Sequence, residues 1–311
     1  MNQEEILKKI EAIENEYSEG NYTIDQAEGS IRETLKNYRG EDRVVSVKDF
    51  VLPLEDEKNS FYSGIEKLDK IYGRLHKGDI FTITAPTNHG KSAFARELFI
   101  RFSQQNKHSL FFAYEDTNYW FIKKLGKHLT QGYIPLVLND RNMTWIEARI
   151  LEAIVKYNVE VVFIDNVKSI TEFKAANVNN SLEAILQKIK DVAVKYNIMI
   201  FLCAHVKKER NDIDINSIKD SSAIADGSSL VIAIKREIEN GEDTGITTFS
   251  VIKNRNNGKL SKFVMKFVPD EPNNTECVSG RFEDTDLEVM VQNVKQGLKF
   301  NNQEDIKIDF N

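Results

Sequence analysis

Short apolar runs alternate with longer amphipathic stretches along most of the chain, beginning near residue 61. Runs rich in valine, isoleucine and phenylalanine predict strands at 80–84, 110–114, 134–138, 159–164, 198–204 and 230–234. Stretches with apolar residues at helical spacing separate most of these runs, at 93–104, 118–129, 144–157 and 181–196. Continuously apolar strands that alternate with helices are typical of a mostly parallel sheet covered on both faces. The pattern therefore predicts an α/β fold.

The segments on either side of this alternating region have different patterns of apolar residues. Two later runs, 247–253 and 262–268, surround Asn257-Gly258, and an Asn-Gly pair between strands is a strong hairpin signal, so antiparallel strands should end the sheet. At the other end, apolar residues at helical spacing predict two helices within 3–38, the second with Thr23 as its N-cap, and both are too short to build a core alone. The expected regions are a helical N-terminal region at 1–39, a linker at 40–60, the α/β core at 61–270 and a polar C-terminal tail at 271–311.

Composition narrows the class of protein. With 311 residues, 41% of them hydrophobic and 29% charged, the chain has the composition of a soluble globular protein. No stretch is apolar for long enough to cross a membrane, and the charged N-terminus is unlike a secretory signal. The two cysteines, Cys203 and Cys277, indicate neither a disulfide framework nor a zinc site. We therefore expect a cytoplasmic protein, and one that does not bind membranes. A formal net charge of −6 gives no sign of nucleic-acid binding, although a groove needs only a local basic lining.

Residues 82–92 carry the most informative motif in the chain. An apolar strand is followed by a tight loop and then by a helix-compatible stretch. This is the layout of a phosphate-binding loop, in which backbone N–H groups and a helix N-terminus surround phosphates. Lys91 would reach the β- and γ-phosphate oxygens, and the Ser92 hydroxyl would bind Mg²⁺. The expected nucleotide-binding residues are Ala85, Pro86, Thr87, Asn88, His89, Gly90, Lys91 and Ser92.

The loop departs from the consensus at one place. The pattern G-x-x-x-x-G-K-[ST] opens with glycine, where this chain has Ala85. The alternative interpretation is an ordinary strand-to-helix turn with a surface lysine. The polar residues at the ends of the other strands therefore decide how much weight the motif carries.

Carboxylates stand at the ends of two predicted strands. Asp165 follows the run 159–164, and ligands of open α/β sheets lie at the carboxyl ends of strands. It either caps a turn or supports Mg²⁺ through water, and an upstream phosphate-binding loop favours the metal. Glu115 follows the run 110–114 and is either a solvated side chain or the general base for an attacking water. Asp116 competes for that role, and the sequence does not separate the two.

The order of these elements resembles the RecA-like P-loop ATPase core of DnaB-family replicative helicases, which also form the helicase half of phage primase-helicases. The resemblance covers about residues 61–270 and begins at Ser63-Gly64, which with Leu68-Asp69 is similar to the S/T-G-x-x-x-L-D motif that opens the family core. Alanine in place of the first loop glycine is common in that family, so Ala85 supports the resemblance.

The resemblance implies further site residues. His205 ends a run similar to the sensor strand, whose terminal residue touches the γ-phosphate; otherwise it merely caps the strand. Lys253 and Arg255 resemble the K-x-R element that one subunit inserts into the ATP site of its neighbour; outside that context they would be a solvated strand edge. Basic residues inserted into a neighbouring site in this way raise the rate of hydrolysis by about 10³–10⁵-fold. We therefore expect hydrolysis to require assembly into a ring. The same resemblance implies that the ring is a hexamer.

Single-stranded DNA is the partner that the resemblance implies. Two loops that follow predicted strands would contact its phosphates without sequence preference, through Lys168, Lys174, Lys207, Lys208, Arg210 and Lys219. The N-terminal helices would pack on the adjacent subunit, bind a loader or fold back on their own core. A primase, helicase loader or polymerase would be supplied by separate chains.

The sequence as a whole predicts a ring-forming, ATP-dependent DNA helicase of a bacterium or phage. Its cofactors would be ATP, or another nucleoside triphosphate, and Mg²⁺. Glu115, His205, Lys253 and Arg255 are the expected catalytic residues, and Ser92 and Asp165 would support the metal. Two alternatives stay open: a RecA-like recombinase or recombination mediator that forms filaments on DNA, and a nucleotide-gated scaffold with little turnover.

Overall fold

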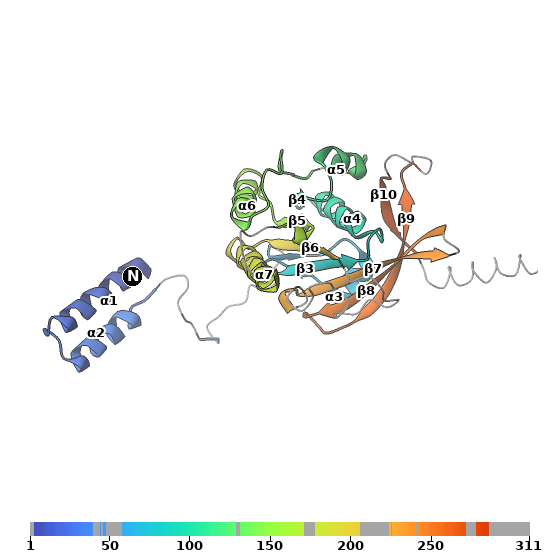
Figure 1. Ribbon diagram of the computed structural model, residues 1–311. Coiled ribbons are helices and arrows are strands. Elements are labelled where there is room, and N and C mark those ends of the chain that lie inside the picture. The colour runs from blue at the N-terminus through green and yellow to red at the C-terminus, as the bar shows by residue number, and fades with distance from the viewer. Residues whose placement is uncertain are drawn as a thin grey trace, which may run out of the picture. The chain divides into compact units, whose positions relative to one another are not determined.

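The computed structural model describes residues 3–39, 44, 46–47, 58–128, 131–170, 178–205, 224, 226–239, 242–271 and 278–285. The chain divides into two compact units, residues 1–56 and 57–311, which are described separately (Figure 1). Every helix in the described ranges is too short or too polar to cross a lipid bilayer.

The N-terminal unit contains the two predicted helices, α1 Gln3–Ser18 and α2 Ile24–Lys36. Thr23 is the predicted N-cap of α2: its hydroxyl accepts from the Gln26 amide, and the Gln26 side chain accepts from the Thr23 amide at 2.9 Å. This capping box satisfies two backbone donors that a helix start leaves unpaired. The two helices contact each other, but Leu7 and Leu35 remain about half exposed. The unit therefore keeps apolar side chains at its surface.

The second unit is built on a mixed sheet. Five strands run parallel to their neighbours: β3 Ile80–Ala85, β4 Ser109–Ala113, β5 Val161–Asp165, β6 Met199–His205 and β7 Leu230–Glu239. Three antiparallel strands continue the sheet: β8 Glu242–Asn254, β9 Ser261–Pro269 and β10 Gly280–Asp284. The order across the eight strands is β10-β9-β8-β7-β3-β6-β5-β4 (Figure 1). The predicted mostly parallel sheet with antiparallel C-terminal strands is confirmed.

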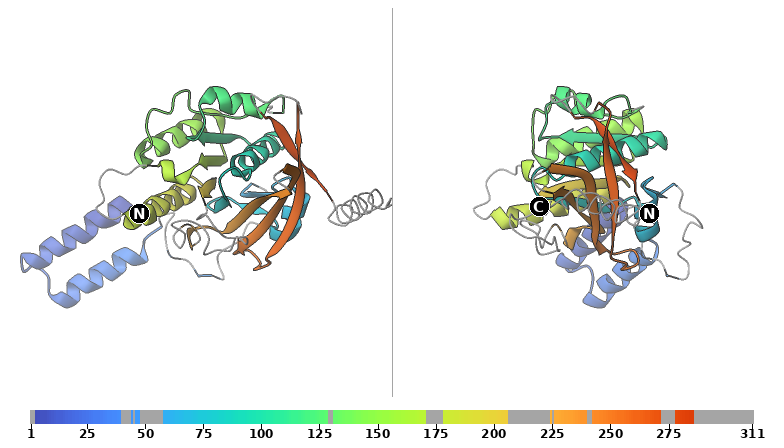
Figure 2. Two further views of the ribbon diagram at one scale, coloured as in Figure 1. Left: turned by 45° about the vertical axis from the view of Figure 1, so that its right-hand side comes forward. Right: turned by 90° about the vertical axis from the view of Figure 1, so that its right-hand side faces the viewer.

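Helices cover both faces of this sheet (Figure 2). One face packs against α3 Glu66–Tyr72, α4 Lys91–Gln104 and α5 Asn118–Leu125. The other packs against α6 Met143–Tyr157 and α7 Val178–Lys195. Alternate residues of each strand enter the two cores, because successive side chains of a strand point to opposite faces. Burial on both faces explains why the strands read as continuously apolar runs.

A ladder of phenylalanine rings ties four parallel strands together beneath α4. Phe111, Phe163, Phe201 and Phe81 are register partners on β4, β5, β6 and β3. Adjacent ring centroids lie 5.3, 4.9 and 5.0 Å apart. Because aromatic neighbours in register pack closely, the ladder fixes the alignment of the strand ends that carry the polar side chains.

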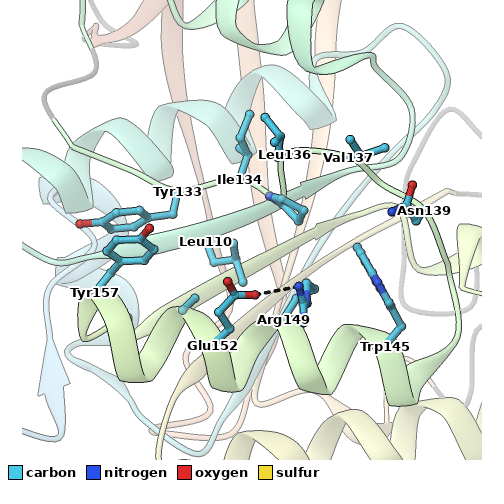
Figure 3. A pocket seen from close by; sticks show the side chains of 12 residues that line it. Leu110, Tyr133, Ile134, Leu136, Val137, Asn139, Trp145, Arg149, Glu152 and Tyr157 are labelled. Carbon is cyan, nitrogen blue, oxygen red and sulfur yellow. Dashed lines mark ion pairs between the residues drawn. The ribbon is translucent and has the colours of Figure 1, made fainter.

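The predicted strand at Ile134–Leu138 is wrong. Only an isolated bridge joins Tyr133 to Leu110 on the edge strand β4, and Pro135 has no N–H to continue the ladder. Leu136 is instead 90% exposed. The segment forms one wall of a cavity of about 420 Å³, opposite α6 residues that include Trp145 (Figure 3).

Two further features differ from the sequence expectation. β10 lies in the stretch expected to be a polar tail, so the sheet continues past residue 270. A small two-stranded sheet, β1 Ser60–Phe61 with β2 Leu75–His76, was also missed. Short strands with few apolar residues give no periodic signal, and their pairing comes from segments distant in sequence.

Candidate nucleotide-binding site

The loop between β3 and α4 has the local structure that its sequence predicts. Ala85 ends β3 fully buried, and the chain then turns through Asn88 and Gly90, both at positive φ, 65° and 91°. Glycine suits the left-handed conformation, and asparagine tolerates it. Gly90 is the N-cap of α4 and Lys91 its first residue, and no side chain caps the helix. The first N–H groups of α4 are therefore open to an anionic ligand.

The loop is also anchored to the neighbouring strand β7. The backbone N–H of Arg236 donates to Nδ1 of His89 at 3.1 Å, and the Arg236 guanidinium donates to the Asn88 carbonyl at 3.0 Å. Burial, together with the positive charge of Arg236, lowers the pKa of His89 and keeps its ring neutral, as an acceptor must be. This anchoring role of Arg236 was not foreseen from the sequence.

Sheet order brings Glu115, His205 and Asp165 together. β6 lies between β3 and β5, and its last residue, His205, pairs in register with Ala85. Asp165 ends β5 beside it, and Glu115 follows β4. The carboxyl ends of four parallel strands thus meet at one edge of the sheet, next to the start of α4.

Lys91 is the centre of this cluster. Its side chain is 6% exposed, and its Nζ lies 3.1 Å from Asp165 Oδ1, 3.4 Å from Glu115 Oε1 and 3.5 Å from His205 Nε2. Burial by itself lowers the pKa of Lys91, but the nearby carboxylates of Asp165 and Glu115 raise it overall. Lys91 is therefore a buried, positively charged ammonium group at the helix N-terminus, which suits it to bind phosphate.

Glu115 is held by several groups. His205 Nε2 lies 2.8 Å from its Oε1, and the Asn166 side-chain amide donates to the same oxygen. Partial burial raises the pKa of Glu115, but Lys91, His205 and Asn166 outweigh burial and lower it. Glu115 is thus ionised at neutral pH, as a general base must be. Asp116 is instead bound by Lys124 Nζ at 2.7 and 2.9 Å.

Asp165 has the environment of a metal-supporting carboxylate. It is 4% exposed, its Oδ1 accepts no hydrogen bond from the described residues, and its contact with Lys91 is an ion pair. The Lys91 ammonium compensates this buried carboxylate, whose two oxygens have about four lone-pair sites and could also bind a second cation. No group of three or more acidic, histidine or cysteine side chains that could hold a metal occurs in the described ranges. Mg²⁺ at phosphates uses one or two protein ligands together with water and substrate oxygens.

Asn166 is a second residue that sequence reasoning missed. It is 7% exposed, follows Asp165 across a cis peptide bond, and contacts both Glu115 and His205. A polar residue directly after a strand-end carboxylate was the available signal. Asparagine is so common in turns that this signal does not distinguish a site residue from an ordinary cap.

Lys253 and Arg255 lie at the opposite edge of the sheet from Lys91. Arg255 N donates to Ser229 O at 2.8 Å, and Ser229 N donates to the carbonyl of Ile80, the first residue of β3. Lys91, by contrast, follows the last residue of β3. The Lys253 ammonium lies 3.4 Å from the Asp226 carbonyl, to which Arg255 also donates. Within one chain the predicted K-x-R element therefore does not join the cluster at Lys91.

Most residues expected to bind DNA lie outside the described ranges, namely Lys174, Lys207, Lys208, Arg210 and Lys219. Lys168 is described: it is exposed on the short 3₁₀ helix η1, Val167–Ser169, directly after β5.

The strand order and the strand-end cluster define a RecA-like P-loop nucleoside triphosphatase fold. The chain matches the family model of a AAA domain over residues 53–211, slightly more than half of its length, and belongs to that family. It is similar in structure to a DnaB-like replicative helicase that was studied in its interactions with primase, with a TM-score of 0.61 and 15% identity over 91% of this chain and 74% of that one. The ATPase domain of G40P is also similar, with a TM-score of 0.61 and 14% identity over 85% of this chain and 99% of that one.

Likeness at this level of identity concerns the fold, and the predicted resemblance to the core of DnaB-family helicases is confirmed at that level. No curated protein sequence matches the chain.

Proposed function

We propose that this protein is an ATP-dependent replicative DNA helicase that forms a ring and translocates on single-stranded DNA. The observation that carries the proposal is the division of the site residues between two edges of one sheet. Lys91, Asp165, Glu115 and His205 meet at one edge, while Arg255 lies at the other. Each edge would supply half of a complete hydrolytic site.

The residues at the first edge would bind and activate the nucleotide. Lys91 and the N–H groups of α4 would bind the phosphates of ATP or another nucleoside triphosphate. Ser92 and Asp165 would hold Mg²⁺, which neutralises phosphate charge. Glu115, ionised and close to Lys91, would accept the proton of the attacking water, because Asp116 is bound by Lys124. His205 would contact the γ-phosphate from the end of β6.

The residues at the second edge would act on a neighbouring copy. Arg255 would stabilise charge on the transferred phosphoryl group and Lys253 would add a second contact. A contact between two different edges of the same chain is head-to-tail, and it closes into a ring when the rotation per subunit allows. Six subunits are expected from the family resemblance.

Lys168 and the basic residues of the two loops after β5 and β6 would contact DNA phosphates. The N-terminal helices would pack on a neighbouring subunit or bind a partner such as a loader, primase or polymerase. The protein would act in the cytoplasm of a bacterium or of a phage-infected host.

Strand displacement on forked DNA tests the activity. The wild-type chain with ATP and Mg²⁺ should separate forks of one tail polarity, and failure on both polarities would refute the helicase. Electron microscopy with ATP and single-stranded DNA should show closed rings; long filaments would instead support a recombinase.

Mixed subunits test action between copies. Arg255→Ala and Glu115→Ala should each be inactive, because each lacks one half of the site. Mixing the two chains should restore part of the hydrolysis, since some interfaces then combine two intact halves. Full hydrolysis by Arg255→Ala alone would contradict the shared site.

A further inference from the structure

The cavity between residues 133–138 and α6 has apolar side chains that the described residues leave uncovered. Leu136 and Val137, on one wall, are 90% and 57% exposed, and Trp145 lies on the opposite wall (Figure 3). The cavity volume of about 420 Å³ lies within the range of ligand pockets, about 300–1,000 Å³. Exposed apolar side chains gathered around a cavity of this size indicate an interaction site.

The α6 wall adds charges of alternating sign. Arg149, Glu152 and Lys156 follow one another along the helix, and Glu152 lies 2.8 Å from Arg149 and 2.5 Å from Lys156. At a rise of about 1.5 Å per residue, the three positions are about 4.5 and 6 Å apart along the helix axis. Arg149 Nε is buried and has no hydrogen-bond partner among the described residues. A carboxylate that enters the cavity would therefore meet a guanidinium that still has a donor to offer.

The C-terminal sequence has a pattern that fits between these two walls. In the stretch Asp305-Ile306-Lys307-Ile308-Asp309-Phe310, charged and apolar residues alternate strictly. Strict alternation is typical of a strand with one apolar and one polar face. The apolar face would consist of Ile306, Ile308 and Phe310, and the charged face of Asp305, Lys307 and Asp309.

The two faces of this segment match the two walls of the cavity. The apolar face would cover Leu136 and Val137, while the charged face would lie against α6. Its negative, positive and negative groups, about 6.6 Å apart, complement the positive, negative and positive groups of α6. The central pair would join Lys307 to Glu152 whichever way the segment runs, because the order of charges is the same from both ends.

The C-terminal segment is long enough to reach the cavity within one chain. The described part of the chain ends at Thr285, directly after β10, and residues 286–304 precede the alternating segment. β10 and β4 are the outermost strands of the sheet, and eight strands spaced about 4.8 Å apart span about 34 Å. At about 3.3 Å per residue, the stretch 286–304 can extend to about 60 Å. It can therefore pass from β10 to the cavity beside β4.

We propose that residues 305–310 dock as a strand in the cavity between residues 133–138 and α6 of the same chain. The segment would cover apolar side chains that the rest of the unit leaves exposed. A partner protein that binds this cavity would have to displace the segment first. The docking uses none of the residues proposed to bind or hydrolyse the nucleotide, so it stands independently of the proposed function.

Disulfide crosslinking of the full chain tests where the segment lies. Leu136→Cys combined with Ile308→Cys, in a chain that also carries Cys277→Ser, should form a disulfide within one chain under mild oxidation. Cys203 is buried and should not take part. Leu136→Cys with Lys307→Cys is the matched control. It should crosslink at least about tenfold more slowly, because neighbouring residues of a strand point to opposite faces.

Two outcomes of the crosslinking would overturn the proposal. Equal rates for the two cysteine pairs would contradict a docked strand with one face toward Leu136. A disulfide between two chains, seen as a doubled mass on a non-reducing gel, would place the segment on a second copy and so contradict docking within the chain.

Tryptophan fluorescence tests the same docking without new cysteines. Trp120→Phe leaves Trp145, at the cavity, as the single tryptophan. In that background, Ile308→Asp should raise the quenching of Trp145 by acrylamide by about twofold, because the segment would no longer cover the cavity. Gln303→Asp adds the same charge outside the alternating segment and should leave the quenching unchanged. An Ile308→Asp chain that is quenched no more than this control would overturn the proposal.

Discussion

Glu97 is the centre of a buried group of ion pairs that holds α4 in place, so its substitution is a direct test of what stabilises the fold. Glu97 is 2% exposed on α4 and accepts from Arg101 Nε at 2.5 Å, from Arg281 Nε and Nη2 at 2.7 and 2.9 Å, and from Phe282 N at 3.2 Å. Arg281 and Phe282 belong to β10, so the cluster ties the outermost strand to the helix that begins at Lys91.

Glu97→Gln removes the charge while keeping the shape. Removing one partner of a buried ion pair costs about 3–5 kcal/mol, because the other charge is left buried without compensation. The side chains of Arg101 and Arg281 are 20% and 18% exposed, and glutamine still accepts a hydrogen bond, so we expect a loss near the lower limit, about 3 kcal/mol. For a unit of this size each kcal/mol lowers Tm by about 2–4 °C, which gives a fall of about 6–12 °C.

The effect of Glu97→Gln should depend on pH. Burial raises the pKa of Glu97, but hydrogen bonds and charge from Arg281 and Arg101 outweigh it and lower the pKa overall. A carboxyl group with a lowered folded pKa stabilises fully above its unfolded value of about 4.3, and this stabilisation is lost as pH falls through the folded pKa. The difference in Tm between wild type and variant should therefore be largest near neutral pH and shrink below about pH 4.

Thermal unfolding followed by circular dichroism measures both effects. Glu152→Gln is the control, since Glu152 forms only partly exposed ion pairs within α6, with Arg149 and Lys156, and should leave Tm almost unchanged. A fall in Tm for Glu97→Gln no larger than that of the control would refute the cluster as a major source of stability. A difference that grows in acid would refute the sign of the pKa shift.

Three further changes test the site and the core. Lys91→Ala should weaken nucleotide binding by about 10- to 100-fold, measured with a fluorescent nucleotide, because it removes a charged donor; unchanged binding would exclude the loop as the phosphate site. Glu115→Gln should keep nucleotide binding but lower hydrolysis by about 10²–10⁴-fold. Since the pKa of Glu115 is lowered, hydrolysis by the wild type should persist as pH falls toward 4.5 and disappear only below it; loss near pH 6 would exclude Glu115 as the titrating base. Phe163→Ala should cost about 3–5 kcal/mol in urea unfolding, because Phe163 is fully buried between two rings of the ladder, and a loss below about 1 kcal/mol would show that the ladder contributes little.

Signals confined to a few neighbouring residues were sufficient for much of the fold. Continuous apolar runs marked the parallel strands because burial on both faces leaves no place for polar residues. Asn257-Gly258 marked the β8–β9 hairpin, whose connection spans residues 255–260 and uses the positive φ of 71° that Gly258 adopts readily. Thr23 marked the start of α2 because its hydroxyl satisfies a backbone donor locally.

The strand expected at Ile134–Leu138 shows where local signals fail. Its apolar residues follow the pattern of a strand, but Leu136 is exposed, and nothing in the pattern states whether another element covers it. The opposite error occurred at β10, where one buried residue, Phe282, and a polar sequence conceal a paired strand. In both places, segments distant in sequence determine whether the residues pair as a strand.

For the candidate site, the sequence by itself determined the chemical types: a glycine and a lysine at a strand-to-helix turn, and carboxylates after apolar strands. Only the tertiary structure decided which of them meet. The insertion of β6 between β3 and β5 brings His205 to Glu115, and the antiparallel return of β8 carries Arg255 to the far edge. Asn166 gained its partners in the same way. The sequence shows which polar residue follows each strand. Whether two such residues come into contact depends on the order in which the strands pack in the sheet.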